Sequence, residues 1–218
     1  MNLIIVGYKG RLGSQIFDKA RVNHNVIGID KDGDIFNLES TKIDAIIDVS
    51  CAENSLKTAK YAKEHKIPLI VGCTGHTKSQ IEEILSIKDT TAVMICPNFS
   101  IGICCFVEAI KQILKGPVTD AYILEKHHKN KKDTPSGTAK MLENIILSSP
   151  ATMHETISIR QNNIVGEHNV EFYFENEHIT LSHSAESRKC FADGAVFALE
   201  HIAGKSAGIY ELRDFLDI

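Results

Sequence analysis

The sequence contains no apolar run of about 18 residues, the length that a membrane-spanning helix needs. It also lacks an excess of basic residues, because its formal net charge is -4 and only the stretch 126–132 is densely basic. Nucleic-acid binding requires a broad basic face that neutralises phosphates. We therefore expect neither a membrane nor a nucleic acid as a partner, and the short basic stretch suits a small anion better.

Cysteine is sparse and irregularly placed. The six cysteines stand at positions 51, 73, 96, 104, 105 and 190, with no Cys-x-x-Cys spacing. This pattern predicts no metal site and no disulfide framework, and it is typical of free thiols in a reducing compartment. The first residues, Met1 to Gly7, lack a basic region in front of an apolar one, so we also expect no signal peptide. Both observations predict a cytoplasmic protein.

Short apolar segments alternate with helical stretches through roughly the first hundred residues. Apolar runs bounded by Gly, Asp and Pro favour strands of a parallel sheet that helices cover on both faces. The predicted strands span 3–6, 26–29, 45–49, 69–71 and 92–95, and the predicted helices span 11–22, 54–65, 78–87 and 99–114.

The pattern changes after the Gly116-Pro117 pair. Alternating segments at 118–125, 156–160, 170–174 and 179–184 predict strands of a mixed sheet, with a hairpin turn at 175–178 and a helix over 136–147. The last thirty or so residues return to helix, over 194–203 and 209–216. We predict an α/β protein in which 1–98 and 189–218 form an N-terminal Rossmann-type parallel-sheet domain and 99–188 form an α+β mixed-sheet substrate domain.

A glycine loop follows the first predicted strand and opens a helix. Glycines there permit a tight turn and close approach of the backbone to a pyrophosphate, whose charge the helix N-terminus stabilises. Asp30 ends the second predicted strand, where a carboxylate accepts from ribose hydroxyls; its alternative role is that of a plain turn residue. Lys31 beside it would meet a 2′-phosphate, so the predicted cofactor is NADH or NADPH. The predicted binding residues are Gly7, Tyr8, Lys9, Gly10, Arg11, Leu12, Gly13, Asp30 and Lys31.

Two further loops leave the carboxyl ends of predicted strands, where a doubly wound sheet binds ligands. Gly72, Cys73 and Thr74 follow the strand 69–71, and Pro97, Asn98 and Phe99 follow the strand 92–95. We expect both loops to line the nicotinamide end of the cofactor site. Either loop alone would be read as plain turn chemistry.

The stretch 125–139 combines three chemical capabilities. His127 and His128 exchange protons near neutral pH, and the lysines at 126, 129, 131 and 132 create a positive field. Thr134 as an N-cap and Pro135 as the first helical residue predict a helix start. The free backbone N–H groups of Ser136, Gly137 and Thr138 would then face an anion. These features predict an active site for a small carboxylate.

An exposed basic turn before a surface helix is the alternative, because runs of charge are usually solvated. Two details oppose it. A doubled histidine has no structural reason to stand at a helix start, and Gly137 destabilises a first helical turn unless the backbone must be approached closely.

The stretch 125–139 resembles the signature Glu-x-His-His-x-x-Lys-x-Asp-x-Pro-Ser-Gly-Thr-Ala of the dihydrodipicolinate reductase family. Other motifs follow in the family's order: the glycine loop with Arg11, 72–75, 97–100, 166–168, 187–188 and 191–195. The resemblance implies NAD(P)H-dependent reduction of a cyclic dicarboxylate, 4-hydroxy-tetrahydrodipicolinate, to tetrahydrodipicolinate in diaminopimelate and lysine biosynthesis. It also implies a homotetramer assembled through the second sheet.

The resemblance also assigns roles to residues. His127 would be the proton donor, and Lys131 would bind the substrate and assist the proton transfer. The further substrate-binding residues would be His128, Ser136, Gly137 and Thr138.

The chain departs from the family pattern in three places, none of them in the stretch 125–139. Cys104 replaces a usual Asn, and Val49-Ser50-Cys51-Ala52 replaces a Phe-Ser/Thr-x-Pro turn. The segment 31–47 is also short for the family.

Two other functions are alternatives to the reductase. An aspartate or homoserine dehydrogenase of similar build leaves the paired histidines and the Pro-Ser-Gly-Thr stretch unexplained. A non-catalytic dinucleotide sensor would need the glycine loop and Asp30, but it has no use for His127 or Lys131.

Overall fold

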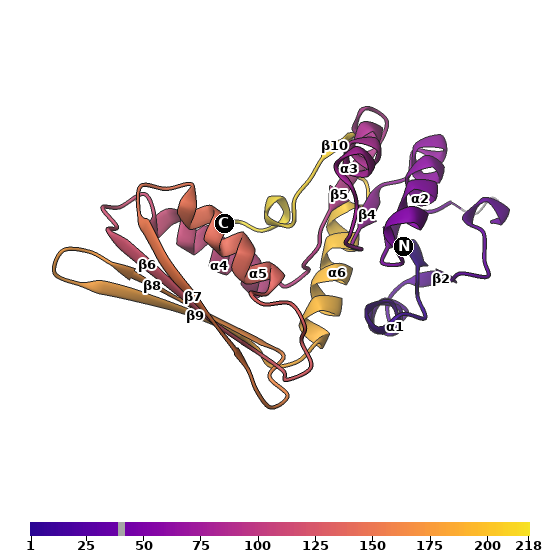
Figure 1. Cartoon of the computed structure of the whole chain (residues 1–218). Coiled ribbons are helices and arrows are strands. Elements are labelled where there is room, and N and C mark those ends of the chain that lie inside the picture. The colour runs from indigo at the N-terminus through magenta and orange to yellow at the C-terminus, as the bar shows by residue number, and fades with distance from the viewer. Residues whose placement is uncertain (39–41) are drawn as a thin grey trace. The chain divides into compact units, whose positions relative to one another are not determined.

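The computed structural model describes residues 1–38 and 42–218, and it divides into two compact units (Figure 1). Unit 1 contains Met1–Ile101 and Lys189–Asp217, and unit 2 contains Gly102–Arg188 with Ile218. The first boundary lies after Ile101, beyond the predicted one after Asn98. Phe99 belongs to unit 1 because its ring packs against Gly72. Within the short segment 31–47, residues 39–41 lie outside the described residues.

Unit 1 is built on a parallel sheet. Its strands are β1 (Asn2–Val6), β2 (Asn25–Ile29), β3 (Ala45–Asp48), β4 (Leu69–Val71), β5 (Ala92–Ile95) and β10 (Gly208–Ile209). They pair in the order β10-β5-β4-β3-β1-β2, and every pairing is parallel. The central strands are almost wholly buried and rich in isoleucine and valine, as a sheet covered on both faces requires. The predicted Rossmann-type sheet is confirmed.

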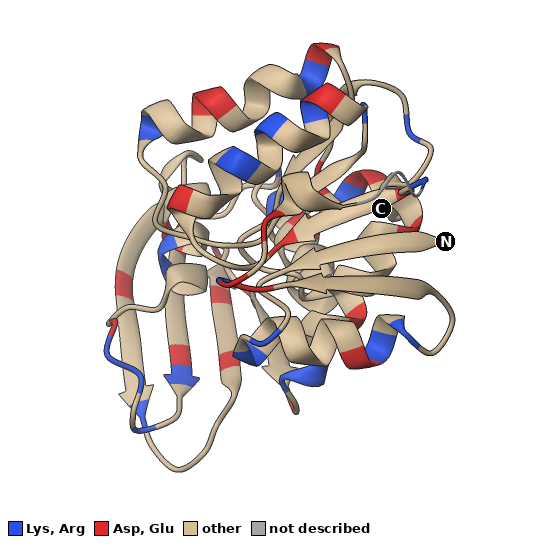
Figure 2. Ribbon diagram, turned by 90° about the vertical axis from the view of Figure 1, so that its right-hand side faces the viewer, with Lys and Arg blue, Asp and Glu red and all other residues tan. Residues whose placement is uncertain are grey.

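Helices cover this sheet on both faces, and they carry most of the charged residues of unit 1 outside its loops (Figure 2). They are α1 (Arg11–Ala20), α2 (Ala52–His65), α3 (Lys78–Leu85) and α6 (Lys189–Ile202). Helix α1 contacts α6, and α2 contacts α3. Gly194 lets α6 approach the backbone closely, because a Cβ there would lie 1.8 Å from the carbonyl oxygen of Phe99.

Unit 2 is a mixed sheet with two helices on one face. It contains α4 (Ile101–Ile113), β6 (Asp120–His127), α5 (Gly137–Leu147), β7 (Thr152–Arg160), β8 (Gly166–Tyr173) and β9 (His178–Ala185). The strand order is β7-β6-β8-β9, with β6 parallel to β7 and antiparallel to β8. Alternate residues of β6 and β8, such as Ile123 and Phe172, pack against α4 and α5. The predicted mixed sheet is confirmed.

The structure corrects two predicted elements. The predicted helix 209–216 is wrong, because Gly208–Ile209 pairs with Ala92–Val93 as an edge strand and only a 3-10 turn, Leu212–Phe215, follows. The predicted N-cap at Thr134 is also wrong. Ser136 caps α5, since its Oγ accepts from the N–H of Ala139 at 3.1 Å.

Among the described residues, no helix is both long and apolar enough to cross a membrane.

Candidate active site

The glycine loop in unit 1 is packed so tightly that only glycine fits at two of its positions. Gly7 has φ +82°, and an added Cβ would lie 2.8 Å from the Cα of Ser50. A Cβ at Gly13 would lie 2.1 Å from the carbonyl oxygen of Gly7. Gly7 and Gly13 are buried, while residues 9–11 are exposed at the N-terminus of α1, where the helix dipole favours negative charge.

A cavity of about 680 Å³ opens beside this loop. It lies at the carboxyl ends of β1, β2 and β3, which is where parallel sheets bind dinucleotides. Gly7, Gly10, Asp30 and Lys31 line it, as the sequence predicts for cofactor-binding residues. Its wall also includes Ser50 and Cys51, from the turn that departs from the family pattern, and Asp32, Asp34, Asn54 and Lys57, which the sequence did not single out. The donor and acceptor set fits a dinucleotide.

The remaining predicted loop residues surround the cavity without lining it. Lys9 reaches back to Asp30, with Nζ 3.8 Å from Oδ2. The ring of Tyr8 packs on Gly28, where a Cβ would lie 2.6 Å away, so this side chain supports the fold. Arg11 and Leu12 form the first turn of α1.

A buried carboxylate holds the turn opposite the glycine loop. Asp48, at the end of β3, accepts from the backbone N–H of Ser50 at 2.9 Å and from the hydroxyls of Ser50 and Thr58 at 2.5 Å each. Burial raises the pKa of Asp48, and these hydrogen bonds oppose the rise. Because Ser50 lies against Gly7 and lines the cavity, Asp48 fixes one wall of this cavity.

The two loops predicted at the nicotinamide end follow β4 and β5. Phe99 is buried against Gly72, while Thr74 and Pro97 are exposed. Burial raises the pKa of the Cys73 thiol to about 11, so Cys73 stays protonated at neutral pH. The Asn98 side chain accepts from the N–H of Ser100 at 2.9 Å and shapes its own turn.

In unit 2, His127 is the last residue of β6 rather than part of a loop. Residues two apart on a strand share a face, so His127 stands beside Glu125 and its Nδ1 is hydrogen-bonded to Glu125 Oε2. Both side chains are buried. Lys126 between them points to the opposite face and pairs with Glu167 at 3.2 Å.

Glu125 is a fully buried charge with several donors. Arg160 binds it through both arms, with Nη1 to Oε2 at 2.9 Å and Nη2 to Oε1 at 2.6 Å. The backbone N–H of Ser136 donates to Oε1 at 3.2 Å. Burial by itself would raise the pKa of Glu125, but the hydrogen bonds from Arg160 and His127 outweigh it and lower the pKa to about 2.

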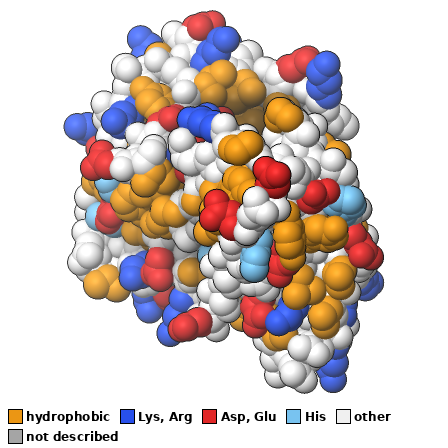
Figure 3. All heavy atoms as spheres, turned by 90° about the vertical axis from the view of Figure 1, so that its left-hand side faces the viewer, with side chains coloured by type: hydrophobic (Ala, Val, Ile, Leu, Met, Phe, Trp, Pro, Cys, Tyr) orange, Lys and Arg blue, Asp and Glu red, His pale blue; other side chains and the backbone are white. Residues whose placement is uncertain are grey.

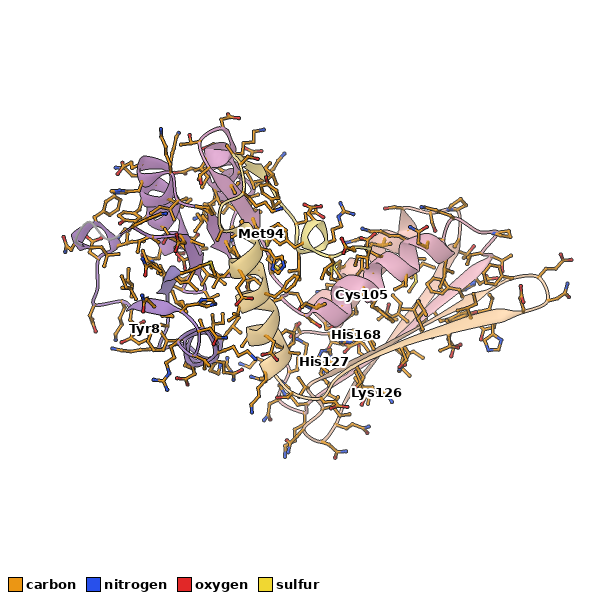
Figure 4. All side chains as sticks on the ribbon, turned by 180° about the vertical axis from the view of Figure 1, so that it is seen from behind. Tyr8, Met94, Cys105, Lys126, His127 and His168 are labelled. Carbon is orange, nitrogen blue, oxygen red and sulfur yellow. The ribbon has the colours of Figure 1, made fainter. Side chains whose placement is uncertain are left out.

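The surroundings of the His127 imidazole favour its neutral form. Burial lowers its pKa, Glu125 opposes the shift, and the charges of Lys131 and Arg160 reinforce it. His168 on β8 lies edge-on to it, with ring centroids 5.2 Å apart, and both rings lie at the same end of the sheet (Figure 4). Burial lowers the pKa of His168 to about 4, and its Nε2 lies 3.3 Å from Ser136 Oγ.

The segment between β6 and α5 holds the other predicted site residues. Lys131 Nζ pairs with Asp133 Oδ1 at 2.9 Å, and Arg188 Nη2 lies 3.4 Å from His128 Nε2. Ser136 is buried and its backbone N–H donates to Glu125, so it holds the start of α5 against β6. An added Cβ at Gly137 would meet nothing within 4 Å. Gly137 and Thr138 are the first two residues of α5.

Sequence reasoning missed the anchoring groups Arg160, Asp48 and the role of Glu125. One signal for Glu125 was present, because Ala121, Ile123, Glu125 and His127 alternate on the buried face of β6. A carboxylate on that face needs a partner. Arg160 gave no such signal, since only the pairing of β6 with β7 brings it there.

Among the described residues, no group of His, Cys, Asp and Glu side chains could hold a metal ion.

Comparisons with known proteins agree along the whole chain. A family model described as dihydrodipicolinate reductase, N-terminus, matches residues 1–99, and one described as dihydrodipicolinate reductase, C-terminus, matches residues 102–216. A 4-hydroxy-tetrahydrodipicolinate reductase of Thermosipho africanus is 35% identical over 219 residues, covering 99% of this chain and 98% of the relative. Another, of Archaeoglobus fulgidus, is 35% identical over 212 residues, covering 88% and 81%.

Solved structures share the fold. Dipicolinate-bound dihydrodipicolinate reductase from Paenisporosarcina sp. TG-14 has a TM-score of 0.85 at 19% identity and covers 99% of both chains. A probable dehydrogenase from Thermotoga maritima has a TM-score of 0.67 at 9% identity, covering 99% of this chain and 92% of the other.

Proposed function

The chain belongs to the dihydrodipicolinate reductase family, and on that premise we propose that it catalyses the NAD(P)H-dependent reduction of 4-hydroxy-tetrahydrodipicolinate to tetrahydrodipicolinate. The reaction belongs to diaminopimelate and lysine biosynthesis. The main support in the structure is the segment from Glu125 to Thr138, which sets a buried imidazole, a lysine and a helix N-terminus in one short stretch. That set suits protonation of an anionic substrate.

The cofactor site is assigned to unit 1. The glycine loop, Gly7 to Gly13, would hold the pyrophosphate, and Asp30 would accept from the ribose hydroxyls. Lys31 offers a cation to a 2′-phosphate. The two loops that follow β4 and β5, with Gly72, Cys73, Thr74, Pro97, Asn98 and Phe99, would border the nicotinamide. When bound, the dinucleotide supplies the hydride.

The proton side of the reaction is assigned to unit 2. His127 would deliver the proton from Nε2, because its Nδ1 is engaged by Glu125. Lys131 would keep its ion pair with Asp133 and donate through another N–H of its ammonium to a substrate carboxylate. His128 and the N–H groups of Gly137 and Thr138 would hold the same anion, while Ser136 keeps the helix start in place. A small dicarboxylate is the substrate class that this arrangement suits.

The mixed sheet supports assembly into a homotetramer. Helices α4 and α5 cover one face of it. Tyr122, Leu124 and Ile157 lie on the other face, and Tyr122 and Ile157 are 38% and 47% exposed. Figure 3 views the molecule from the side on which Figure 1 draws unit 2, and it shows apolar side chains gathered between charged ones. An open sheet face with large apolar residues favours contact with a second copy.

We assign the enzyme to the cytoplasm. All six cysteines are free thiols, which a reducing compartment preserves.

Replacing His127 with Gln should lower the turnover rate by about two to four powers of ten, because general-acid assistance is worth that much. Cofactor oxidation with the dicarboxylate substrate and cofactor binding, measured separately, test this. Binding should hardly change. The exposed His178→Gln serves as a control, and near-native turnover in His127→Gln would remove His127 from the mechanism.

Lys131→Ala should raise the substrate KM and lower turnover, because a carboxylate loses its cation. Pyridine-2,6-dicarboxylate should inhibit the parent enzyme competitively and bind the variant more weakly by about 1.5–3 kcal/mol. Dinucleotide affinity should not move. Lys129→Ala, two residues away and exposed, should have a much smaller effect; equal losses at both positions would mean a diffuse basic patch.

Asp30→Ala should weaken NADH binding more than NADPH binding, because Lys31 remains for the 2′-phosphate while the ribose acceptor is lost. Dissociation constants for the two cofactors measure the difference. Asp18→Ala, at an exposed ion pair with Arg21 on α1, should change neither. If Asp30→Ala binds both cofactors as tightly as the parent does, Asp30 is only a structural residue of the turn after β2.

Sedimentation should find four 24.1-kDa chains in the native particle. Ile157→Glu should give smaller species, because it places a charge on the open sheet face. Leu147→Glu replaces an apolar residue that is 64% exposed at the end of α5 and should leave the particle intact. A native protein that sediments as a monomer contradicts the assembly.

A further inference from the structure

Arg160, the last residue of β7, contacts two parts of the candidate active site at once. Nη1 donates to Glu125 Oε2 at 2.9 Å and to the Ile159 carbonyl oxygen at 2.9 Å. Nη2 donates to Glu125 Oε1 at 2.6 Å and to the Asp133 carbonyl oxygen at 2.8 Å. Building on the proposed function, we propose that Arg160 is a positioning residue that holds the proton donor His127 and the substrate-binding Lys131 in one arrangement.

The first arm of this arrangement runs through Glu125 to His127. An ionised carboxylate only accepts hydrogen bonds, so His127 Nδ1 must carry the proton that it shares with Glu125. Nε2 is thereby left as the atom that gains and loses the transferred proton. Arg160 grips both oxygens of Glu125, which stops the carboxylate from rotating away from the imidazole. The guanidinium therefore fixes the tautomer and orientation of His127.

The second arm runs through the loop to Lys131. Arg160 holds the backbone of Asp133, and the Asp133 side chain holds Lys131 Nζ at 2.9 Å. The two chains of contacts share one nitrogen of Arg160, because Nη2 donates both to Glu125 and to the Asp133 carbonyl oxygen. Movement of Arg160 would therefore disturb the proton donor and the substrate lysine together.

A merely structural role for Arg160 is the competing explanation, because a buried carboxylate needs a cation for stability. The two roles differ in what they do to His127. Four titratable or charged groups face this imidazole: Glu125 on β6, Arg160 on β7, His168 on β8 and Lys131 in the loop. His168 stays neutral, since burial lowers its pKa to about 4.

The sign of each effect on His127 follows from charge. Glu125 stabilises the protonated imidazole, whereas Arg160 and Lys131 destabilise it. Removing the Arg160 charge should therefore raise the pKa of His127, and removing the Glu125 charge should lower it. Since the protonated form is the donor, kcat/KM should fall as pH rises through this pKa.

The experiment compares Arg160→Gln, Arg160→Lys and Glu125→Gln with the parent protein. The profile of kcat/KM against pH should move to higher pH in Arg160→Gln and to lower pH in Glu125→Gln, each by about one unit. In both variants kcat should fall about tenfold to a hundredfold, the usual effect of losing a group that orients a site residue. NMR titration of the His127 ring should show the same opposite shifts without any substrate.

Arg160→Lys separates charge from geometry. It keeps the positive charge, so the midpoint should move less, but one ammonium cannot span two carboxylate oxygens and a carbonyl, so kcat should still fall. Lys115→Gln removes an exposed cation that bonds Gln112 at the end of α4 and should leave both readouts unchanged. NADH binding should be native in every folded variant.

Native kcat and an unmoved His127 titration in a folded Arg160→Gln protein would overturn the proposal. If that variant does not fold, native kcat in Arg160→Lys overturns it instead. Failure of the proposed function looks different. The parent would then not oxidise NADH with the dicarboxylate, yet the opposite NMR shifts would still support the Arg160 network.

Discussion

The hydrogen-bonded burial of one carboxylate, Glu125, is the constraint on which the candidate active site of unit 2 depends. An isolated buried charge costs several kcal/mol, so it persists only where donors surround it. Here the donors come from three elements: Arg160 from β7, the N–H of Ser136 from the start of α5, and His127 from β6 itself. Satisfying the carboxylate therefore sets the imidazole and the helix N-terminus at fixed positions.

Unit 1 also contains a buried, hydrogen-bonded carboxylate, but the pKa of this group shifts in the opposite direction. Asp48 lies buried beneath a turn and holds the Ser50 wall of the cofactor cavity, as Glu125 holds the start of α5. Its donors are hydroxyls and a backbone N–H rather than a guanidinium, so burial prevails and raises the pKa of Asp48. Glu125, with Arg160 beside it, has a lowered pKa. Arg160 therefore keeps Glu125 ionised, and the ionised carboxylate accepts a hydrogen bond from His127.

The sequence allowed the sheet types and the glycine loop beside the cavity to be predicted, because apolar periodicity and glycine placement are local. It failed where long-range pairing decides. Ile209 forms an edge strand only because β5 is there to pair with it. The helix cap is Ser136 rather than the predicted Thr134, because Glu125 accepts from the Ser136 N–H and His168 contacts its hydroxyl. Arg160 could not be assigned, because the register of β7 on β6 is invisible in the sequence.

The tautomer of His127 in the resting protein tests the account most directly. Nitrogen NMR of the protein with ¹⁵N-labelled histidine, recorded at a pH above the His127 pKa so that the ring is neutral, distinguishes the two ring nitrogens. If Glu125 organises the site, Nδ1 carries the proton and Nε2 is bare. A signal from His127 protonated at Nε2, or a mixture of both tautomers, would contradict the claim that the carboxylate held by Arg160 fixes the tautomer of the proposed proton donor.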